Sequence, residues 1–440
     1  MYDIIIIGAG PAGLFAAYEL SKYKNLKVLV IEQGRDVKKR NSLLSGIGGA
    51  GLFSDGKLNL TAVHQKTNLY EFLPKKEADK LIDSVDDIFI KFGAPRKIYT
   101  KSQKKAKELQ KKARKHNINL LLIKQKHLGS DRLPTLISKF VSDLKKNNVK
   151  FLLNNEVKEL IIKDKKITGV KLNKKIIRSK YVIACPGRIG ADWILNEAKR
   201  LGIPFRYRGI EVGVRVELPA KKMKHITDYI WDPSFITVNK NNHDTTRTFC
   251  VCPYGFVAQE TYHGFNCVNG YCNIDKRSKN TNFALLSNIE LTHPAENTIK
   301  YGQDIGKLAT TIAGNKPFIQ RLVDLKKHRR SYWHRINKSK VKPTLKSVMP
   351  ADLTMAIPHR IVSNLLDALN QLDKVIPGIN NDVLLYGPEL KFFSVRILTN
   401  KNLETKVKNL FVAGDGVGVC GNIIGAAATG IIAARGVLNK

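Results

Sequence analysis

The chain begins MYDIIIIGAGPAGLFAAYELSKYKNLKVLVIE over residues 1–32, and this stretch predicts the first unit of the fold. An apolar run at Asp3–Ile7 predicts a buried strand, and the glycine-rich turn after it leads into a helix predicted over Leu14–Tyr23. A second apolar run, Lys27–Ile31, predicts another strand with Glu32 at its end. The order strand, glycine turn, helix, strand and acid is typical of a dinucleotide-binding β-α-β unit.

Each glycine of the turn meets a separate physical requirement. Gly8 permits a tight turn out of the strand, and Gly10, which has no Cβ, lets a pyrophosphate approach the backbone. Gly13 lets the helix pack closely on the sheet, while Pro11 suits a first helical turn, where its missing N–H is no loss. The helix N-terminus attracts phosphates, and Glu32 can accept hydrogen bonds from a ribose diol. Glycines also serve ordinary turns, but strand, helix and acid together favour the dinucleotide site.

The C-terminal segment narrows the cofactor to a flavin. Leu410–Ala413 predicts a strand, Gly414 and Asp415 follow it, and a helix rich in small residues is predicted over Ile423–Leu438. An Asp at the end of a strand can hold the hydroxyls of a ribityl chain, and the new helix N-terminus can face negative charge on a flavin ring. The alternative is a simple glycine-rich turn. Together with the N-terminal unit, the pattern predicts bound FAD.

Length and composition predict two folded domains and no membrane span. The chain has 440 residues, of which 43% are hydrophobic, and no window of about eighteen residues is apolar without interruption. The N-terminal apolar run lacks a basic leader and ends in glycines, so a signal peptide is not expected. A soluble, cytoplasmic protein is expected.

The six cysteines are too few for a disulfide scaffold in a chain of this length. Cys250, Cys252, Cys267 and Cys272 cluster, but the spacing C-x-C…C-x4-C matches no common zinc pattern. On adjacent strands, alternation would place several of these thiols on one buried face. Buried inert thiols are therefore favoured over a four-thiolate site, and no metal is expected.

The net charge is +38, from 75 Lys and Arg against 37 Asp and Glu. Such a surface attracts polyanions such as nucleic acid, although a biased genome composition gives the same lysine excess without any partner. Lys101–His116 predicts a surface helix with a solvated basic face. Lys326–Lys342 interleaves Tyr332 and Trp333 with basic residues, as nucleic-acid binders do. For this second segment, a solvated stretch with its aromatic side chains turned into the core is the favoured alternative.

The rest of the pattern predicts a discontinuous domain with an insertion. Ser45–Lys57 is glycine-rich but does not lie between a strand and a helix, so it predicts a loop whose bare backbone lies against something flat or anionic. A helix is predicted over Leu133–Lys146. A three-stranded meander and a buried strand are predicted next, from the runs Val149–Leu153, Val157–Lys163, Thr168–Leu172, Lys175–Arg178 and Tyr181–Gly187.

Strand-like runs dominate residues 202–393, with helical stretches after them. The predicted strands are Gly213–Leu218, Thr248–Cys252, Phe256–Glu260 and Cys267–Tyr271, and the predicted helices are Gly302–Ile312, Pro317–Leu325 and Ile361–Leu372. The predicted fold class is α/β, with a Rossmann-like FAD-binding domain formed by residues 1–201 and 394–440. Residues 202–393 are expected to form an inserted α+β substrate or cap domain.

On these motifs the chain resembles a family of FAD-dependent dehydrogenases, also described as NAD(FAD)-utilising and mostly uncharacterised, with a glutathione-reductase-type FAD-binding fold. The strings that carry the resemblance are Gly49-Ala50-Gly51, Ser54-Asp55-Gly56-Lys57-Leu58, His127-Leu128-Gly129-Ser130-Asp131, Gly213-Val214-Arg215-Val216-Glu217, Thr248-Phe249-Cys250-Val251-Cys252-Pro253, Asn269-Gly270, Ser394-Val395-Arg396-Ile397 and the C-terminal Gly-Asp segment. Two departures concern the substrate side. Tyr254 separates Pro253 from Gly255, and Lys391-Phe392-Phe393-Ser394 replaces the family's Thr-Ser-Ser-Pro, so substrate identity is not carried over.

The resemblance implies a bound FAD and a redox role. It implies that Glu32 holds the adenosine ribose, that Arg40 reaches the adenosine side, that the backbone around Val157 meets the adenine, and that Asp415 holds the ribityl chain or pyrophosphate. The full expected cofactor set is Gly8, Gly10, Pro11, Ala12, Gly13, Glu32, Gln33, Arg40, Gly49, Ala50, Val157, Ala184, Gly187, Gly414, Asp415, Gly421 and Ile424. Lys57 and Arg396 become candidates for the flavin face or an anionic substrate. The alternative for Lys57 is that it is a solvated loop lysine, and the alternative for Arg396 is that it forms an internal ion pair.

The expected reaction is hydride transfer through flavin N5 to or from an unknown small molecule. The sequence has no second strand-glycine-helix unit and no cysteine pair in the segment after Glu32, which excludes the thiol–disulfide mechanism of the pyridine-nucleotide disulfide reductases. NAD(P)H is expected, if at all, as a transient co-substrate in residues 202–393. The alternatives are an FAD-dependent RNA-modifying enzyme and an FAD-stabilised protein that binds RNA or another polyanion.

Overall fold

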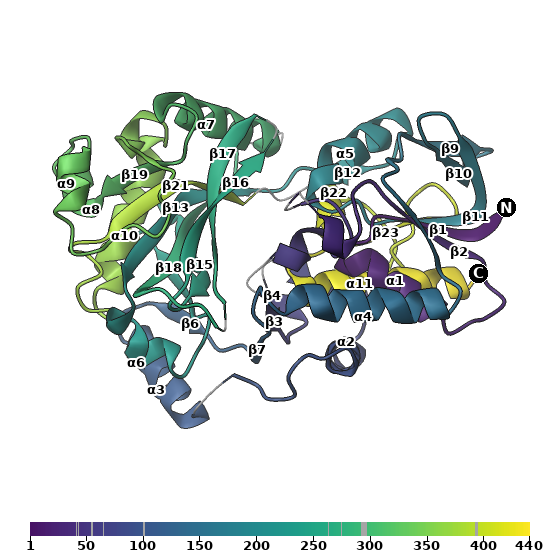
Figure 1. The fold of residues 1–440 in the computed structure, drawn as a ribbon, viewed down its shortest axis with the longest axis horizontal. Coiled ribbons are helices and arrows are strands. Elements are labelled where there is room, and N and C mark those ends of the chain that lie inside the picture. Colours follow the sequence, from purple (N-terminus) through teal and green to yellow (C-terminus); the bar gives the residue numbers. More distant parts are fainter. Residues whose placement is uncertain are drawn as a thin grey trace. The chain divides into compact units, whose positions relative to one another are not determined.

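The computed structural model describes residues 1–440 except 41, 43, 54, 55, 65, 100, 101, 263, 274, 292–296 and 392–394. It divides into two compact units. Unit 1 comprises residues 1–97, 126–208 and 393–440, and unit 2 comprises residues 98–125 and 209–392 (Figure 1). Both ends of the chain therefore lie in unit 1. Residues 98–125 were expected in the first domain, but the structure groups them with unit 2, where one of their strands joins the sheet.

Unit 1 is built on a seven-stranded sheet whose central strand is β1 (Tyr2–Ile7). Five strands run parallel in the order β8-β2-β1-β11-β23, and β10 and β9 continue the sheet antiparallel from the first half of β11. The bounds are β2 (Val28–Glu32), β8 (Lys150–Leu153), β9 (Glu159–Lys163), β10 (Lys166–Lys171), β11 (Ile176–Ala184) and β23 (Leu410–Val412). The buried apolar runs of β1 and β2 form the middle of the sheet, as parallel strands covered on both faces require.

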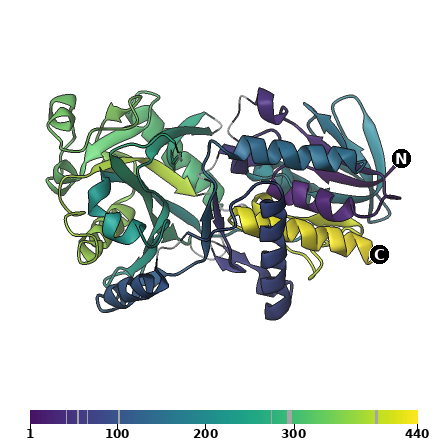
Figure 2. The ribbon, with the colours of Figure 1, turned by 60° about the horizontal axis from the view of Figure 1, so that its bottom comes forward.

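Helices of unit 1 pack through an aromatic cluster and through small residues. Phe15 of α1 (Pro11–Leu20) contacts Phe140 of α4 (Leu133–Lys146) edge to face, with ring centroids 5.1 Å apart. α1 and α11 (Ile423–Leu438) run side by side, as the purple and yellow helices of Figure 2 show. The other elements of unit 1 are β3 (Lys57–Asn59), β4 (Val63–His64), β5 (Thr67–Asn68), α2 (Lys75–Lys91), α5 (Ala191–Arg200), β12 (Phe205–Arg206) and β22 (Arg396–Ile397), and β7 (Gln125–His127) begins at the unit boundary.

Unit 2 contains an eight-stranded sheet in the order β20-β19-β21-β13-β18-β15-β14-β6. Its neighbours are antiparallel except for β19 and β20. The strands are β6 (Asn119–Leu121), β13 (Ile210–Pro219), β14 (Ser234–Val238), β15 (Thr245–Cys252), β18 (Asn280–Ile289), β19 (Phe318–Arg321), β20 (Met349–Pro350) and β21 (Leu384–Lys391), and β16 (Phe256–Tyr262) and β17 (Phe265–Tyr271) form a separate hairpin. The helices are α3 (Gln103–Arg114), α6 (Lys224–Thr227), α7 (Thr298–Ile312), α8 (Leu322–Lys326), α9 (Trp333–Asn337) and α10 (His359–Leu372).

Helices α10 and α7 cover parts of this sheet. α10 packs against β13, β15 and β18, and α7 packs against β17 and β21. The stripe of Ile361, Leu365, Leu369 and Leu372 on α10 is fully buried, as its helical spacing predicts. None of the helices in the described part of the chain is long and apolar enough to cross a membrane.

Several predicted elements need correction. Pro317–Leu325 was predicted to be helical, but Phe318–Arg321 is strand β19, paired with β21, and only the short helix α8 follows. The apolar run fits either period, and pairing with β21 decides it. The runs Lys175–Arg178 and Tyr181–Gly187 belong to the single strand β11. Val149–Leu153 is not part of the meander, because β8 pairs in parallel with β2 instead.

The close contact between α1 and α11 can be tested by substitution. A Cβ on Gly430 would lie 2.1 Å from the carbonyl oxygen of Ala12, so Gly430→Ala forces the helices apart. We expect this variant to lose about 1–3 kcal/mol of unfolding free energy, as overpacked cores do, measured by urea denaturation followed by circular dichroism. Gly10→Ala is the matched control, because its added Cβ would lie 3.8 Å from the Cα of Gly49, an ordinary van der Waals distance. Equal losses in the two variants would contradict the close helix contact.

Candidate cofactor site

The turn after β1 has a shape that only glycine can adopt at its first position. Gly8 has a φ of +97°, and a Cβ there would lie 2.2 Å from the carbonyl oxygen of Cys185. Its N–H donates to the carbonyl of Ile31 at 2.7 Å, which joins the turn to β2. A Cβ on Gly13 would lie 1.9 Å from the carbonyl oxygen of Gly8, so the helix begins directly on the turn. The backbone N–H groups of this first helical turn have no acceptor within the helix, as in any helix.

The second glycine-rich segment lies against the first turn. Gly48 donates its N–H to the carbonyl of Ala9 at 2.8 Å, and a Cβ on Gly49 would lie 3.0 Å from the Cα of Gly10. The bare backbone of this segment therefore lies against another bare backbone, at the N-terminus of α1. Of the predicted Ser45–Lys57 loop, Ser54 and Asp55 lie outside the described residues.

The carboxylate of Glu32 joins these pieces. It is 5% exposed and accepts backbone N–H groups from three segments, Ala9 at 2.8 Å, Gly34 at 2.9 Å and Gly46 at 2.9 Å. Its own carbonyl accepts the N–H of Asn155 at 3.1 Å, which brings the segment before Val157 beside it. The side chain expected to hold a ribose thus also holds the glycine turn and the loop in register.

Arg40 binds the same loop through its guanidinium group. It donates to the carbonyls of Ser42, Ile47 and Gly49, with Nη1 2.7 Å from the Gly49 oxygen. Burial lowers the pKa of Arg40 to about 10, and the charge of Glu32 opposes this shift. In this structure Arg40 therefore shapes the loop, and its expected contact with adenosine stays a prediction.

The C-terminal segment meets the end of β11 beside the turn. Ala413 donates its N–H to the carbonyl of Ala184 at 3.0 Å, and a Cβ on Gly416 would lie 2.2 Å from the carbonyl oxygen of Gly187. A Cβ on Gly414, which has a φ of +91°, would lie 3.1 Å from the Cβ of Ala12. The structure therefore brings the N-terminal turn, the end of β11 and the Gly-Asp segment together.

Two features of this segment were not anticipated from the sequence. Asp415 forms an ion pair with Arg188, with Oδ2 3.0 Å from Nε. Asn422 caps α11, because its side chain accepts the N–H of Gly425 at 2.7 Å and donates to the hydroxyl of Thr67 at 3.1 Å. The Gly-Arg-Ile-Gly string after the YVIACPG strand was the available signal for Arg188, whereas nothing local marks Thr67.

The two candidate catalytic residues occupy different surroundings. Lys57 is 6% exposed in β3, so it is not the solvated loop lysine of the alternative interpretation. Arg396 is 8% exposed and forms the ion pair that its alternative described, with Nη2 2.8 Å from Oε2 of Glu71. It also donates to the carbonyl of Gly418 at 3.1 Å, directly after the Gly-Asp segment. Of the remaining expected residues, Ile424 is buried in the first turn of α11 and Gln33 is exposed after β2.

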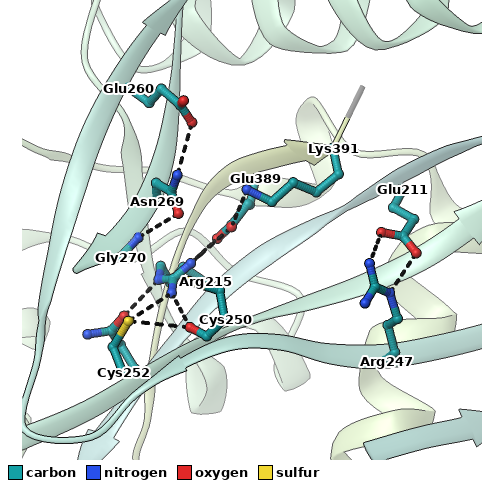
Figure 3. A network of polar contacts seen from close by, with 11 residues as sticks. Glu211, Arg215, Arg247, Cys250, Cys252, Glu260, Asn269, Gly270, Glu389 and Lys391 are labelled. Atoms are coloured by element: carbon teal, nitrogen blue, oxygen red, sulfur yellow. Dashed lines mark hydrogen bonds and ion pairs between the residues drawn. The ribbon is translucent and has the colours of Figure 1, made fainter. Parts of the chain in front are cut away.

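Unit 2 contains a buried polar network, formed by residues of the motifs that carry the family resemblance, which was not predicted from the sequence (Figure 3). Arg215 is fully buried and donates from Nη1 to both oxygens of Glu389 at 2.9 Å. Its Nη2 donates to the carbonyl of Cys250 at 2.7 Å and lies 3.8 Å from Sγ of Cys252. Lys391 Nζ is 3.3 Å from Glu389 on its other side. Although burial opposes its charge, Glu389 raises the pKa of Arg215, so the guanidinium stays charged.

This network explains sterically why the Asn269-Gly270 string contains a glycine. A Cβ on Gly270 would lie 2.2 Å from Nη2 of Arg215, so glycine makes room for the guanidinium group. Cys250 has a φ of +50°, where the pairing of β15 with β18 is interrupted by a bulge. A left-handed conformation at a non-glycine residue is strained, and such strain concentrates at functional positions.

The cysteines are free thiols, and all but Cys250 are buried. Burial raises the pKa of Cys185, Cys267 and Cys420, so these thiols are protonated at neutral pH. Among the residues that the structure describes, no group of three or more His, Cys, Asp or Glu side chains is placed to hold a metal ion.

Three family models match different parts of the chain. Residues 209–391 match the model of the FAD-dependent protein C-terminal domain, residues 1–54 that of the Thi4 family, and residues 362–440 that of glucose inhibited division protein A. An uncharacterised protein of Clostridium beijerinckii (strain ATCC 51743 / NCIMB 8052) is 25% identical over 480 residues, covering 99% of this chain and 80% of that protein. A glycerol 3-phosphate dehydrogenase of Caloramator mitchellensis is 30% identical over 217 residues, covering 44% of each chain. Glycine oxidase from Bacillus cereus ATCC 14579 aligns with a TM-score of 0.42 at 10% identity, covering 100% of this chain and 98% of that one.

The family-model matches and the sheet of unit 1 confirm the predicted α/β fold and the resemblance to FAD-dependent proteins. The family models that match are those of FAD-dependent proteins, which agrees with the predicted FAD-dependent oxidoreductase. The match over 209–391 coincides with the continuous part of unit 2, while the match over 1–54 covers the glycine turn and the loop that lies on it.

Glu32→Gln tests the role of the carboxylate. An amide keeps one acceptor oxygen but turns an N–H donor toward N–H groups that now donate to Glu32. We expect a loss of about 1–3 kcal/mol of unfolding free energy, because buried donors are left unsatisfied, and weaker retention of flavin through purification. Glu156→Gln is the control, since the Glu156 side chain is 51% exposed and pairs with the exposed Lys158. A Glu32→Gln variant as stable as the control would contradict the joining role.

Proposed function

We propose that unit 1 binds FAD along the glycine turn, the loop around Gly49 and the Gly414-Asp415 segment, and that the enzyme transfers a hydride to or from a small molecule. When bound, FAD supplies the redox chemistry, because N5 of its ring accepts or gives the hydride. The observation that carries the proposal is the cradle of bare backbone at Gly10 and Gly49, placed at the N-terminus of α1. A pyrophosphate fits there because the N–H groups and the helix dipole favour an anion and no side chain intervenes.

The residues around the cradle have separate roles in this proposal. Glu32 uses three of the roughly four acceptor positions of its carboxylate for backbone N–H groups, which leaves one for a ribose hydroxyl. Asp415, held by Arg188, would accept from the ribityl hydroxyls. The N-terminus of α11, capped by Asn422, presents its dipole to the negative charge of a reduced ring. Val157, Ala184 and Gly187 would line the adenosine and pyrophosphate sides.

Unit 2 would serve the substrate side, since its residues 209–392 make up most of the domain predicted over residues 202–393. The Arg215–Glu389–Lys391 network is a fixed set of charges there, and Lys391 is the first residue of the segment that departs from the family's pattern. NAD(P)H would act as a transient electron donor, since the sequence has only one strand-glycine-helix unit. Free thiols fit a reducing compartment such as the cytoplasm.

Gly10→Ala tests FAD binding apart from folding. The added methyl group occupies the space for the pyrophosphate, so we expect the variant to purify without flavin absorbance but to be as stable as wild-type protein from which the flavin has been removed. Anaerobic titration of the yellow wild-type protein with NADH or NADPH then identifies the donor by loss of that absorbance. Wild-type protein that shows no flavin bands even after reconstitution would overturn the proposal.

A specific observation favours a second function, the binding of RNA or another polyanion by the segment Lys326–Lys342. The interpretation that its aromatic side chains enter the core is wrong, because Tyr332 and Trp333 are 47% and 45% exposed. The guanidinium carbons of Arg330 and Arg335 lie 5.3 and 5.6 Å from the centroid of the Tyr332 ring. Exposed rings among cations are the usual surface for stacked bases of a single strand. The other basic segment forms helix α3, with Ala106 and Ala113 buried as predicted, while Lys101 lies outside the described residues.

Replacing both rings tests this second function. We expect the double variant Tyr332→Ala, Trp333→Ala to bind a single-stranded RNA at least about tenfold more weakly in fluorescence anisotropy, since each stacked base contributes about 1–3 kcal/mol. Leu308→Ala is the control, because Leu308 is an exposed apolar side chain of α7 at 48% exposure. Affinity that falls steeply with salt yet is unchanged in the double variant would show charge attraction without a stacking surface, against this proposal.

A further inference from the structure

Three arginines of unit 1 gather beside the C-terminal Gly-Asp segment. Strands β12 and β22 pair antiparallel, with Arg206 directly opposite Arg396. Directly opposite residues point to the same face of the ladder, and like charges in that position destabilise it. The pairing therefore places two positive charges together at a cost in folding stability.

A third guanidinium group joins them at one carbonyl oxygen. Nη1 of Arg208 and Nη1 of Arg396 both donate to the carbonyl of Gly418, so the two groups are neighbours around a single acceptor. Gly418 adopts a φ of +71° directly after the short helical turn Asp415–Val417. The cluster therefore lies at the segment that the proposed function assigns to the flavin.

Arg396 is held rigidly within the cluster. Its guanidinium carbon lies 5.2 Å from the centroid of the Phe72 ring, and its Nη2 pairs with Glu71. Burial lowers the pKa of both Arg208 and Arg396, and neighbouring arginines lower it further, while Glu71 opposes the shift. Glu71 is 43% exposed, so solvent weakens its compensation of the cluster. An anion entering beside Arg206, whose side chain is exposed, would relieve the repulsion.

We propose that Arg206, Arg208 and Arg396 bind an anionic group, a carboxylate or a phosphate, on the small molecule that the enzyme oxidises or reduces. This inference rests on the proposed function, because it takes the neighbouring Gly-Asp segment as the flavin end of the site. Planar guanidinium groups match carboxylate and phosphate oxygens in paired hydrogen bonds, which makes them suited to this ligand. Arg396 positions the group, Arg208 shares the same carbonyl, and Arg206 supplies the charge nearest to solvent.

Isothermal titration calorimetry of the purified protein with sodium acetate and with inorganic phosphate, at constant ionic strength, tests the site. We expect one of these anions to bind the wild type and Arg206→Gln to weaken that binding by about tenfold, the effect of one lost charge-assisted hydrogen bond. Arg206→Lys should recover most of the affinity, and acetamide, which is neutral, should not bind. Arg178→Gln, which removes an exposed arginine of β11, is the matched control and should bind as the wild type does.

Glu71→Gln separates a ligand site from a merely structural cluster. Removing the carboxylate that pairs with Arg396 should tighten anion binding, since it removes a competing negative charge. Binding that is weaker in Glu71→Gln, unchanged in Arg206→Gln, or absent from the wild type for both anions would overturn the inference. Flavin content, read from absorbance in the same samples, reports on the proposed function separately. Flavin-containing protein without anion binding defeats only the anion site, whereas Arg206-dependent binding in protein that cannot take up flavin defeats only the FAD assignment.

Discussion

Three backbone N–H groups, from the turn after β1, the segment after β2 and the glycine-rich loop, donate to the buried carboxylate of Glu32. A buried carboxylate is stable only when its oxygens are hydrogen-bonded, and buried N–H groups equally require acceptors. Here the carboxylate and the three N–H groups satisfy each other's hydrogen bonds. As a result, the glycine turn and the loop lie backbone against backbone at the start of α1. The cofactor cradle and the position of Arg40, which donates to the carbonyls of Ile47 and Gly49 in this loop, depend on this arrangement.

Unit 2 has a comparable constraint in the pair Arg215–Glu389. Both side chains are fully buried, and desolvation of two charges is compensated only by close geometry and further hydrogen bonds. Asn282, the carbonyl of Cys250 and Lys391 supply these, and Gly270 leaves the space. Strands β13, β15, β17, β18 and β21 all contribute a residue. Such a network connects four strands of the sheet with β17 of the separate hairpin and fixes a set of charges in place.

The features that could be predicted from the sequence are those formed by residues that lie close together along the chain. Gly8, Gly10, Gly13 and Glu32 are recognisable because turn, helix start and strand end follow within about thirty residues. The helix over Leu133–Lys146 was predicted with both ends correct, because its apolar stripe has one period. By contrast, Phe318–Arg321 is a strand only because β21 lies beside it, and residues 98–125 join unit 2 because β6 pairs with β14. Local pattern contains no information about such partners.

The same distinction applies to the candidate site. The sequence alone determined that a dinucleotide turn opens the chain and that a Gly-Asp strand-helix closes it, since each requires particular residues at fixed short spacings. Only the tertiary structure decided that Arg40 binds its own loop, that Tyr332 and Trp333 face solvent, and that Arg206, Arg208 and Arg396 meet at Gly418. The physical reason is that charge and burial depend on distance in space. Residues nearly two hundred positions apart along the chain become neighbours only when strands β12 and β22 pair.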